Sequence, residues 1–115
     1  MPSTTPYKRG DIVLVTFPFT DLSSSKRRPA LVVSPDSFNE LMQDLVLAGI
    51  TSQLADDGSL TIDREDCVNG HLPKKSIVKP AKLFTMHSSL VLKTICTLRR
   101  EKRDAVLAQI RQFFS

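Results

Sequence analysis

The sequence predicts a small, strongly bent antiparallel β-sheet or barrel that is followed by one amphipathic helix. Three observations support this fold class. Short apolar segments of strand length recur from about residue 11 to about residue 97, with brief polar turns between them. A long helical apolar repeat is found near the C-terminal end, at residues 106–114. Helices that could connect parallel strands are missing from the pattern, which disfavours βαβ units.

The first two strands are expected on either side of a polar loop. An almost continuous apolar run covers Asp11–Phe17 and stops at Pro18. The stretch TDLSSSKR is typical of a loop, and the second strand is expected over Ala30–Ser34. Because both runs are apolar at successive positions, each strand should be buried on both faces.

A short helix and a third strand come next. Pro35 ends the second strand, and Asp36 or Ser37 can cap a helix that continues through Phe38–Met42. The third strand is expected over Leu45–Thr51. It is again apolar at successive positions, as a buried strand would be.

The remaining strands are shorter. The stretch SLTID alternates Leu60 and Ile62 toward the interior and predicts a fourth strand. We expect residues 64–73 to be irregular. Further short strands are predicted at 76–79, 83–86 and 91–97.

The closing helix is predicted from the spacing of its apolar residues. The expected buried stripe consists of Val106, Leu107, Ile110, Phe113 and Phe114. The arginines outside this stripe are expected to be solvated: Arg99, Arg103 and Arg111.

Length and composition fit one domain that spans residues 1–115. With 41% hydrophobic residues, the chain can bury a core without disulfides. It has no apolar run near the roughly 18 residues of a membrane span. The opening stretch MPSTTPY lacks the apolar segment of a secretion signal. We therefore expect a cytoplasmic protein with no membrane association.

Cysteines and histidines are the residues that most often indicate disulfides or metal sites. Cys67 and Cys96 form no CxxC pair, so we expect buried or idle thiols. His71 and His87 have no second ligand at metal-binding spacing, and the glycines are too scattered for a phosphate-binding loop. We therefore expect neither a metal nor a cofactor.

The formal net charge is +4, and the basic residues gather in clusters. These clusters are Lys8–Arg9, Lys26–Arg28, Lys74–Lys75 with Lys79 and Lys82, and Arg99–Arg103. Several basic clusters in a short chain make nucleic acid a candidate partner. The alternative is that each cluster is a solvated surface.

Two short stretches carry groups suited to phosphate chemistry. Arg28 precedes Pro29, which favours an extended backbone at the entrance of the second strand. Its guanidinium is a planar fork of donors that matches two phosphate oxygens. Thr51 and Ser52 stand where the third strand meets a loop, a common place for binding groups. The alternatives are ordinary loop charges at 26–28 and a strand end that satisfies its own backbone.

Four stretches, in this order, resemble the MazF/PemK family of toxin–antitoxin ribonucleases. They are RGDIVLV (9–15), RRPALVVSPDSFN (27–39), LAGITSQ (47–53) and SIVKPAKLFTM (76–86). The resemblance implies an SH3-like barrel of the MazF/Kid/CcdB type with a C-terminal helix. It also implies a homodimer that a cognate antitoxin protein neutralises.

The resemblance further implies sequence-selective, metal-independent cleavage of single-stranded RNA. In that chemistry the ribose 2′-hydroxyl attacks the adjacent phosphorus and leaves a 2′,3′-cyclic phosphate and a 5′-hydroxyl. Arg28 and Thr51 match the family's catalytic positions in residue type. We expect Arg28 to stabilise the negative charge of the transition state and Thr51 to orient the reacting groups. The general base stays open.

RNA contacts are expected from an aromatic side chain and a cationic track. Among Phe17, Phe19 and Phe84, Phe19 is the preferred stacking residue, although a core role suits all three. The other expected RNA-binding residues are Lys26, Arg27, Ser52 and Lys79.

Two departures from the family leave other functions open. Some members have an Arg and an Asp where this chain has Lys79 and Ala81, and the loop LSSSKR lacks the Gly and carboxylate that many members carry. A catalytically inactive relative that binds only antitoxin or RNA is therefore one alternative. Another is a gyrase inhibitor like CcdB, although the ending Gln112-Phe113-Phe114-Ser115 lacks the Trp of that protein's active tip.

Overall fold

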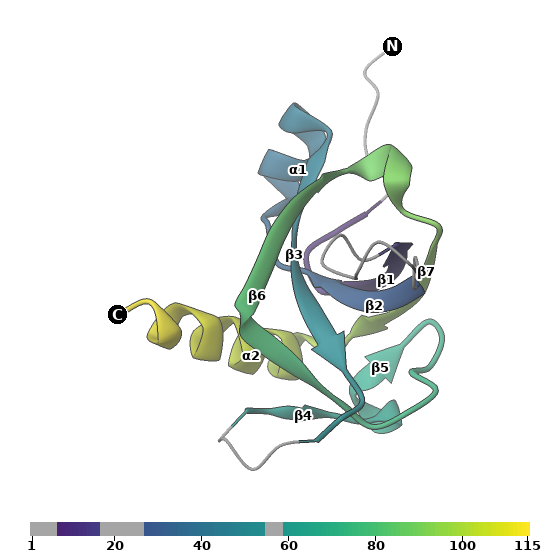
Figure 1. Cartoon of the computed structure of the whole chain (residues 1–115), viewed down its shortest axis with the longest axis vertical. Helices are drawn as coiled ribbons and strands as arrows, with labels where there is room; N and C mark the ends of the chain where they lie inside the picture. Colours follow the sequence, from purple (N-terminus) through teal and green to yellow (C-terminus); the bar gives the residue numbers. More distant parts are fainter. Residues whose placement is uncertain (1–6, 17–26, 55–58) are drawn as a thin grey trace, which may run out of the picture.

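A curled antiparallel sheet forms the body of the protein in the computed structural model, which describes residues 7–16, 27–54 and 59–115 (Figure 1). Within these residues the sheet has seven strands in the order β4-β6-β3-β2-β1-β7-β5, and every pairing is antiparallel. The strands are β1 (Asp11–Thr16), β2 (Arg27–Val32), β3 (Asp44–Thr51), β4 (Thr61–Ile62), β5 (Cys67–Val68), β6 (Ser76–His87) and β7 (Lys93–Leu98).

Two α-helices and two 3₁₀ turns complete the described elements. They are α1 (Asp36–Met42), α2 (Arg100–Phe113), η1 (Arg64–Asp66) and η2 (Ser88–Leu90). Neither α-helix is long and apolar enough to cross a membrane. The predicted combination of a mainly β sheet and a C-terminal helix is therefore confirmed.

The apolar runs of β1, β2 and β3 are buried on both faces, as their continuous apolar character predicts. Neighbouring residues belong to different apolar clusters: Ile12 to one and Val13 to the other. Leu31 of β2 joins the cluster of Ile12, which also contains Val106 and Ile110 of α2. Because successive side chains of a strand point to opposite faces, each run supplies both clusters at once.

Several element boundaries differ from the prediction. β2 begins at Arg27 rather than at residue 30, so Arg28 and Pro29 are part of the strand. β6 is one continuous strand instead of two short ones. Its pairing with β3 shifts register between the pairs Ala48–Leu83 and Ile50–Val78, and Pro80 lies within this irregularity. A bulge tolerates a residue without an N–H group, so Pro80 does not end the strand.

Residues 64–73 are more ordered than predicted. The 3₁₀ turn η1 has a carboxylate version of a capping box. Asp63 accepts a hydrogen bond from the N–H of Arg64 (2.8 Å), and Asp66 accepts one from the N–H of Asp63 (2.8 Å). β5 follows directly and pairs with β7 through Cys67 and Leu98. The sequence gives little sign of this strand because it is only two residues long.

The predicted cap of α1 is wrong. Pro35 holds the cap position, and no side chain caps the helix. Asp36 instead accepts a hydrogen bond from the N–H of Arg9 (2.8 Å), and so ties the helix to the segment before β1.

The apolar stripe of α2 is shorter than predicted. Val106 and Ile110 are buried and Leu107 is half-buried, but Phe113 and Phe114 are 55% and 65% exposed. The last turn of α2 extends past β6 (Figure 1), where the rings of Phe113 and Phe114 pack edge-to-face on each other with centroids 5.0 Å apart. Arg103 also departs from expectation, because it is half-buried and its stem lies against Gly10.

The two cysteines are buried free thiols, one of the two states predicted for them. The Cys96 thiol donates a hydrogen bond to the Cys67 sulfur at 3.1 Å. Burial raises the pKa of the Cys96 thiol, and the hydrogen bond with Cys67 and the charge of Asp11 raise this pKa further. The folded protein therefore holds the Cys96 proton more tightly than the unfolded chain does.

We expect this thiol to make folding less favourable at alkaline pH. The stabilisation is complete below the unfolded thiol pKa of about 8.5 and declines above it, because the unfolded state then loses the proton first. Urea unfolding at about pH 7 and about pH 10 should show a larger loss of unfolding free energy for the native chain than for Cys96→Val. Equal losses in the two proteins would contradict this account.

Candidate active site

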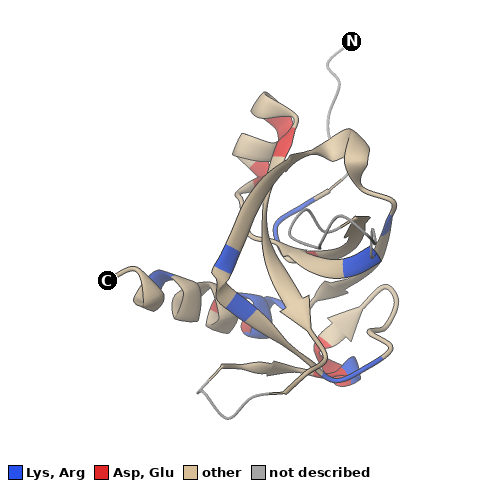
Figure 2. Ribbon diagram, viewed as in Figure 1, with Lys and Arg blue, Asp and Glu red and all other residues tan. Residues whose placement is uncertain are grey.

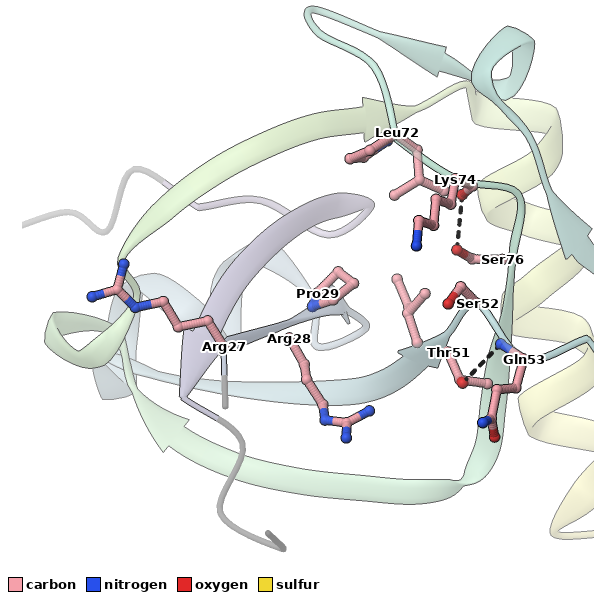
Figure 3. Close-up of a pocket in the computed structure, with 11 residues that line it drawn as sticks. Arg27, Arg28, Pro29, Thr51, Ser52, Gln53, Leu72, Lys74 and Ser76 are labelled. Atoms are coloured by element: carbon pink, nitrogen blue, oxygen red, sulfur yellow. Dashed lines mark hydrogen bonds between the residues drawn. The ribbon is translucent and has the colours of Figure 1, made fainter. Parts of the chain in front are cut away.

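A pocket of about 450 Å³ opens where β2 begins and β3 ends (Figure 3). Three segments form its walls: the start of β2, the end of β3 with the residues that follow, and the stretch that leads into β6. The lining residues are Arg27, Arg28, Pro29, Ile50, Thr51, Ser52, Gln53, Leu72, Pro73, Lys74 and Ser76. Ile50 and Leu72 also belong to the apolar cluster beneath α2, so the pocket lies directly over the core.

The pairing of β2 with β3 brings Arg28 and Thr51 to the same place. In the ladder between these strands, the pair nearest the pocket is Ala30 opposite Gly49. Continuing that antiparallel register by two residues sets Arg28 opposite Thr51 on the same face of the sheet. The two residues predicted to be catalytic therefore line one pocket.

Arg28 has a buried donor without a partner. Its Nε atom is shielded from solvent and makes no hydrogen bond within the described residues. The guanidinium extends to the side of the pocket where Thr51 and Gln53 lie (Figure 3). A buried donor left unpaired costs about 1–3 kcal/mol, so an anion that accepts this N–H would recover that cost. Of the described residues that line the pocket, none is a carboxylate that could do so.

The Thr51 hydroxyl makes one hydrogen bond with the local backbone. The Thr51 oxygen accepts a hydrogen bond from the N–H of Gln53 at 3.1 Å. This contact is the strand-end interaction that sequence reasoning gave as the alternative. A hydroxyl also has one donor and a second lone pair, and the contact with Gln53 uses neither. Thr51 therefore keeps the capacity to bind a ligand in the pocket.

The third wall of the pocket was not predicted. It consists of Leu72, Pro73, Lys74 and Ser76. Leu72 is 3% exposed and fixes the wall to the core, while the Ser76 hydroxyl donates to the carbonyl of Lys74 at 2.9 Å. The cluster of basic residues at 74–75 was the one sequence signal for this wall. For Gln53, which also lines the pocket, the one sequence signal was its place in the stretch ITSQ.

The other predicted site residues are distributed differently. Arg27 lines the pocket, but its side chain extends away from the other lining residues, and Ser52 is exposed in the lining (Figure 3). Lys79 lines a second cavity of about 470 Å³ beside α2, together with Ala81. Phe19 and Lys26 lie outside the described residues.

The remaining candidates have structural surroundings. Phe84 is 9% exposed and belongs to the core cluster of Val13, whereas Phe17 lies outside the described residues. His71 and His87 are exposed, and His87 Nδ1 accepts the N–H of Ser89 at 3.1 Å. No group of three or more potential metal ligands occurs among the residues that the structure describes.

Charge is distributed unevenly along the sheet (Figure 2). Lys and Arg lie at the start of β2 and on β6, whereas α1 carries the acidic residues Asp36 and Glu40. Because α1 precedes β3 and the pocket lies at the other end of β3, these carboxylates are at the far end of that strand from Arg28.

Comparison with known proteins identifies the family. A family model described as PemK-like, MazF-like toxin of type II toxin-antitoxin system matches residues 8–114. No curated protein sequence matches the chain. The curled sheet with its C-terminal helix is the fold of MazF toxin structures. The chain belongs to the PemK-like, MazF-like toxins of type II toxin–antitoxin systems.

Solved structures agree with this fold. Mycobacterium tuberculosis toxin MazF-mt6 has a TM-score of 0.71 at 17% identity, covering 90% of this chain and 95% of that one. An endoribonuclease in complex with its cognate antitoxin from Mycobacterial species has a TM-score of 0.69 at 14% identity, covering 92% and 95%. MazE-MazF (Form-III) from Deinococcus radiodurans has a TM-score of 0.63 at 22% identity, covering 93% and 91%.

We expect Gly70→Ala to destabilise the wall that carries Lys74. Gly70 has φ +127°, and a Cβ there would lie 2.3 Å from the carbonyl oxygen of Ile95. Backbone strain and this clash should lower the unfolding free energy by about 1–3 kcal/mol in urea unfolding. Asn69→Gly is the matched control, since it relieves a positive φ (55°) and should change stability by less than about 1 kcal/mol. Unchanged stability of Gly70→Ala would contradict the packing described here.

Proposed function

We propose that this toxin is a sequence-selective, metal-independent endoribonuclease that cleaves single-stranded RNA. The 2′-hydroxyl attacks the adjacent phosphorus, the bond from phosphorus to the 5′-oxygen breaks, and the products carry a 2′,3′-cyclic phosphate and a 5′-hydroxyl. Family membership supports this activity. The observation that carries it is the buried Nε of Arg28, which has no hydrogen-bond partner among the described residues and lies in a pocket shared with the hydroxyl of Thr51.

Arg28 stabilises the transition state. Negative charge accumulates on the nonbridging oxygens as the 2′-oxygen approaches phosphorus, and a guanidinium offers these oxygens two parallel charge-assisted donors. Because the Arg28 Nε is already desolvated, it loses little hydration when the phosphate binds.

Thr51 positions the reacting groups. Its hydroxyl donates to a phosphate oxygen or to the 2′-oxygen while its own oxygen holds the N–H of Gln53. The described pocket lining contains neither a carboxylate nor an imidazole. The catalytic contribution of this lining is therefore electrostatic stabilisation and positioning, without the factor of about 10²–10⁴ that a general base typically adds.

Cationic side chains and one aromatic ring bind the RNA that enters the pocket. Arg27 and Ser52 lie at the pocket itself, and Lys79 contributes from the cavity beside α2. Phe19 and Lys26, which precede β2 in the sequence, supply a stacking ring and a further cation. The protein acts in the cytoplasm.

Arg28→Ala should lower RNA cleavage by at least about 100-fold, the usual effect of removing one donor to a developing oxyanion. Purified protein is incubated with a long single-stranded RNA in EDTA, and the product ends are mapped for cyclic phosphate. Arg28→Lys keeps the charge but loses the fork, so its rate should lie between those of Arg28→Ala and the native chain. Arg111→Ala, which removes an exposed arginine in the last turn of α2, is the matched control and should cleave normally.

Other results would favour other functions. Absence of cleavage combined with trapping of gyrase on DNA would indicate a CcdB-like inhibitor. Absence of both would indicate a relative that only binds antitoxin or RNA. Cleavage by Arg28→Ala at the native rate would overturn the role given to Arg28.

The protein acts as a homodimer that a cognate antitoxin inhibits. Two structural relatives support the antitoxin partner: one is a MazE-MazF structure, and the other is an endoribonuclease in complex with its cognate antitoxin. Expression of the toxin alone should arrest growth, and coexpression with the product of the adjacent upstream reading frame should relieve the arrest. Persistent arrest, with both proteins present in the cell, would contradict this pairing.

A further inference from the structure

We propose that Lys74 is a second phosphate-binding cation of the pocket and contacts the same phosphodiester as Arg28. The proposal rests on the proposed function and adds a residue to its site. Lys74 and Arg28 both line the pocket but come from different walls. In Figure 3 the Lys74 ammonium points from its wall into the space between the segments, with Thr51 and Ser52 at the side.

The backbone of the Lys74 wall is held in place by three contacts. Leu72 is buried in the cluster beneath α2. Gly70 lies so close to Ile95 that a Cβ would meet its carbonyl oxygen at 2.3 Å. The Ser76 hydroxyl then holds the carbonyl of Lys74 itself at 2.9 Å. Lys74 is exposed and its stem is flexible, and the fixed backbone keeps its ammonium within reach of the pocket.

The charge of the pocket favours this role. Arg28 and Lys74 share a lining in which none of the described residues is acidic, so their charges are not neutralised there. A phosphodiester that gains charge in the transition state is a ligand that two cations in one pocket fit. The two cations bind phosphate differently. A guanidinium donates to two oxygens at once, whereas an ammonium acts as a point charge.

The position of Lys79 also supports a role for Lys74 in the pocket. Lys79 stands where some family members have an arginine, yet it lines the cavity beside α2 and not the lining that contains Arg28. Arg27 also lines the pocket, but its side chain extends away from the other lining residues, so the second cation directed toward the pocket within one chain is Lys74 (Figure 3). Lys74 and its neighbour Lys75 are both exposed, but only Lys74 is part of the lining. This pair of adjacent lysines provides a matched comparison.

The test measures binding and cleavage separately. Binding uses a fully 2′-O-methylated segment of the single-stranded RNA from the cleavage assay, titrated at several salt concentrations. Loss of one phosphate contact lowers the slope of log affinity against log salt by about 0.7 for a single strand. We expect this change for Lys74→Met and not for Lys75→Met. Lys74→Arg should restore the slope, and thermal unfolding should show that all three variants are folded.

Cleavage by Lys74→Met should fall at least tenfold in kcat/KM, while Lys75→Met should cleave like the native chain. If Lys74→Met keeps both the native salt slope and the native kcat/KM, the inference is overturned. The proposed function still stands in that case, provided that the native chain cleaves and Arg28→Ala does not. If the native chain binds RNA with the Lys74-dependent slope but never cleaves it, the proposed function fails and the binding role of Lys74 stands.

Discussion

The antiparallel pairing of β3 with its two neighbours is the constraint on which the site depends. β3 pairs with β6 from Asp44–His87 to Thr51–Ile77, and with β2 from Val32–Leu47 to Ala30–Gly49. Both ladders converge where β3 ends, β2 begins and β6 begins. Where a strand ends, side chains can reach a ligand, and backbone N–H groups that have no partner in the sheet can pair with nearby hydroxyls. The Thr51 hydroxyl accepts the N–H of Gln53 in this way. The pocket is thus a consequence of register and not of loop conformation alone.

The parts of the site that sequence predicts are those fixed by local chemistry. Arg28 is held extended by Pro29, and Thr51 follows a run of buried strand residues, so both could be placed from a few neighbouring letters. The same holds for β1, β3 and the buried part of α2, whose apolar periodicity is strong. Patterns of this kind depend only on residues that are close in the chain, so the contacts that form on folding do not change what they predict.

The parts that sequence misses depend on contacts between distant residues. The wall that carries Lys74 is fixed by Gly70 against Ile95 and by Leu72 in the core, and neither contact leaves a periodic pattern. Pro80 looks like the end of a strand, yet the register shift against β3 accommodates it. Phe113 and Phe114 continue the helical repeat, but the sheet ends before they do.

The pocket combines two properties that stability alone would not favour. Its cations share one lining without an acidic partner among the described residues, and the Arg28 Nε is desolvated without an acceptor among those residues. An apolar side chain of similar size would avoid both costs, since unpaired buried polar groups destabilise a fold. The β-sheet beside the pocket packs apolar clusters on both of its faces, and this packing fixes the strands that carry Arg28 and Thr51. Such a preorganised and unneutralised cationic site is stabilised when an anion enters, and a phosphodiester that gains charge as it reacts is stabilised more in its transition state than in its ground state.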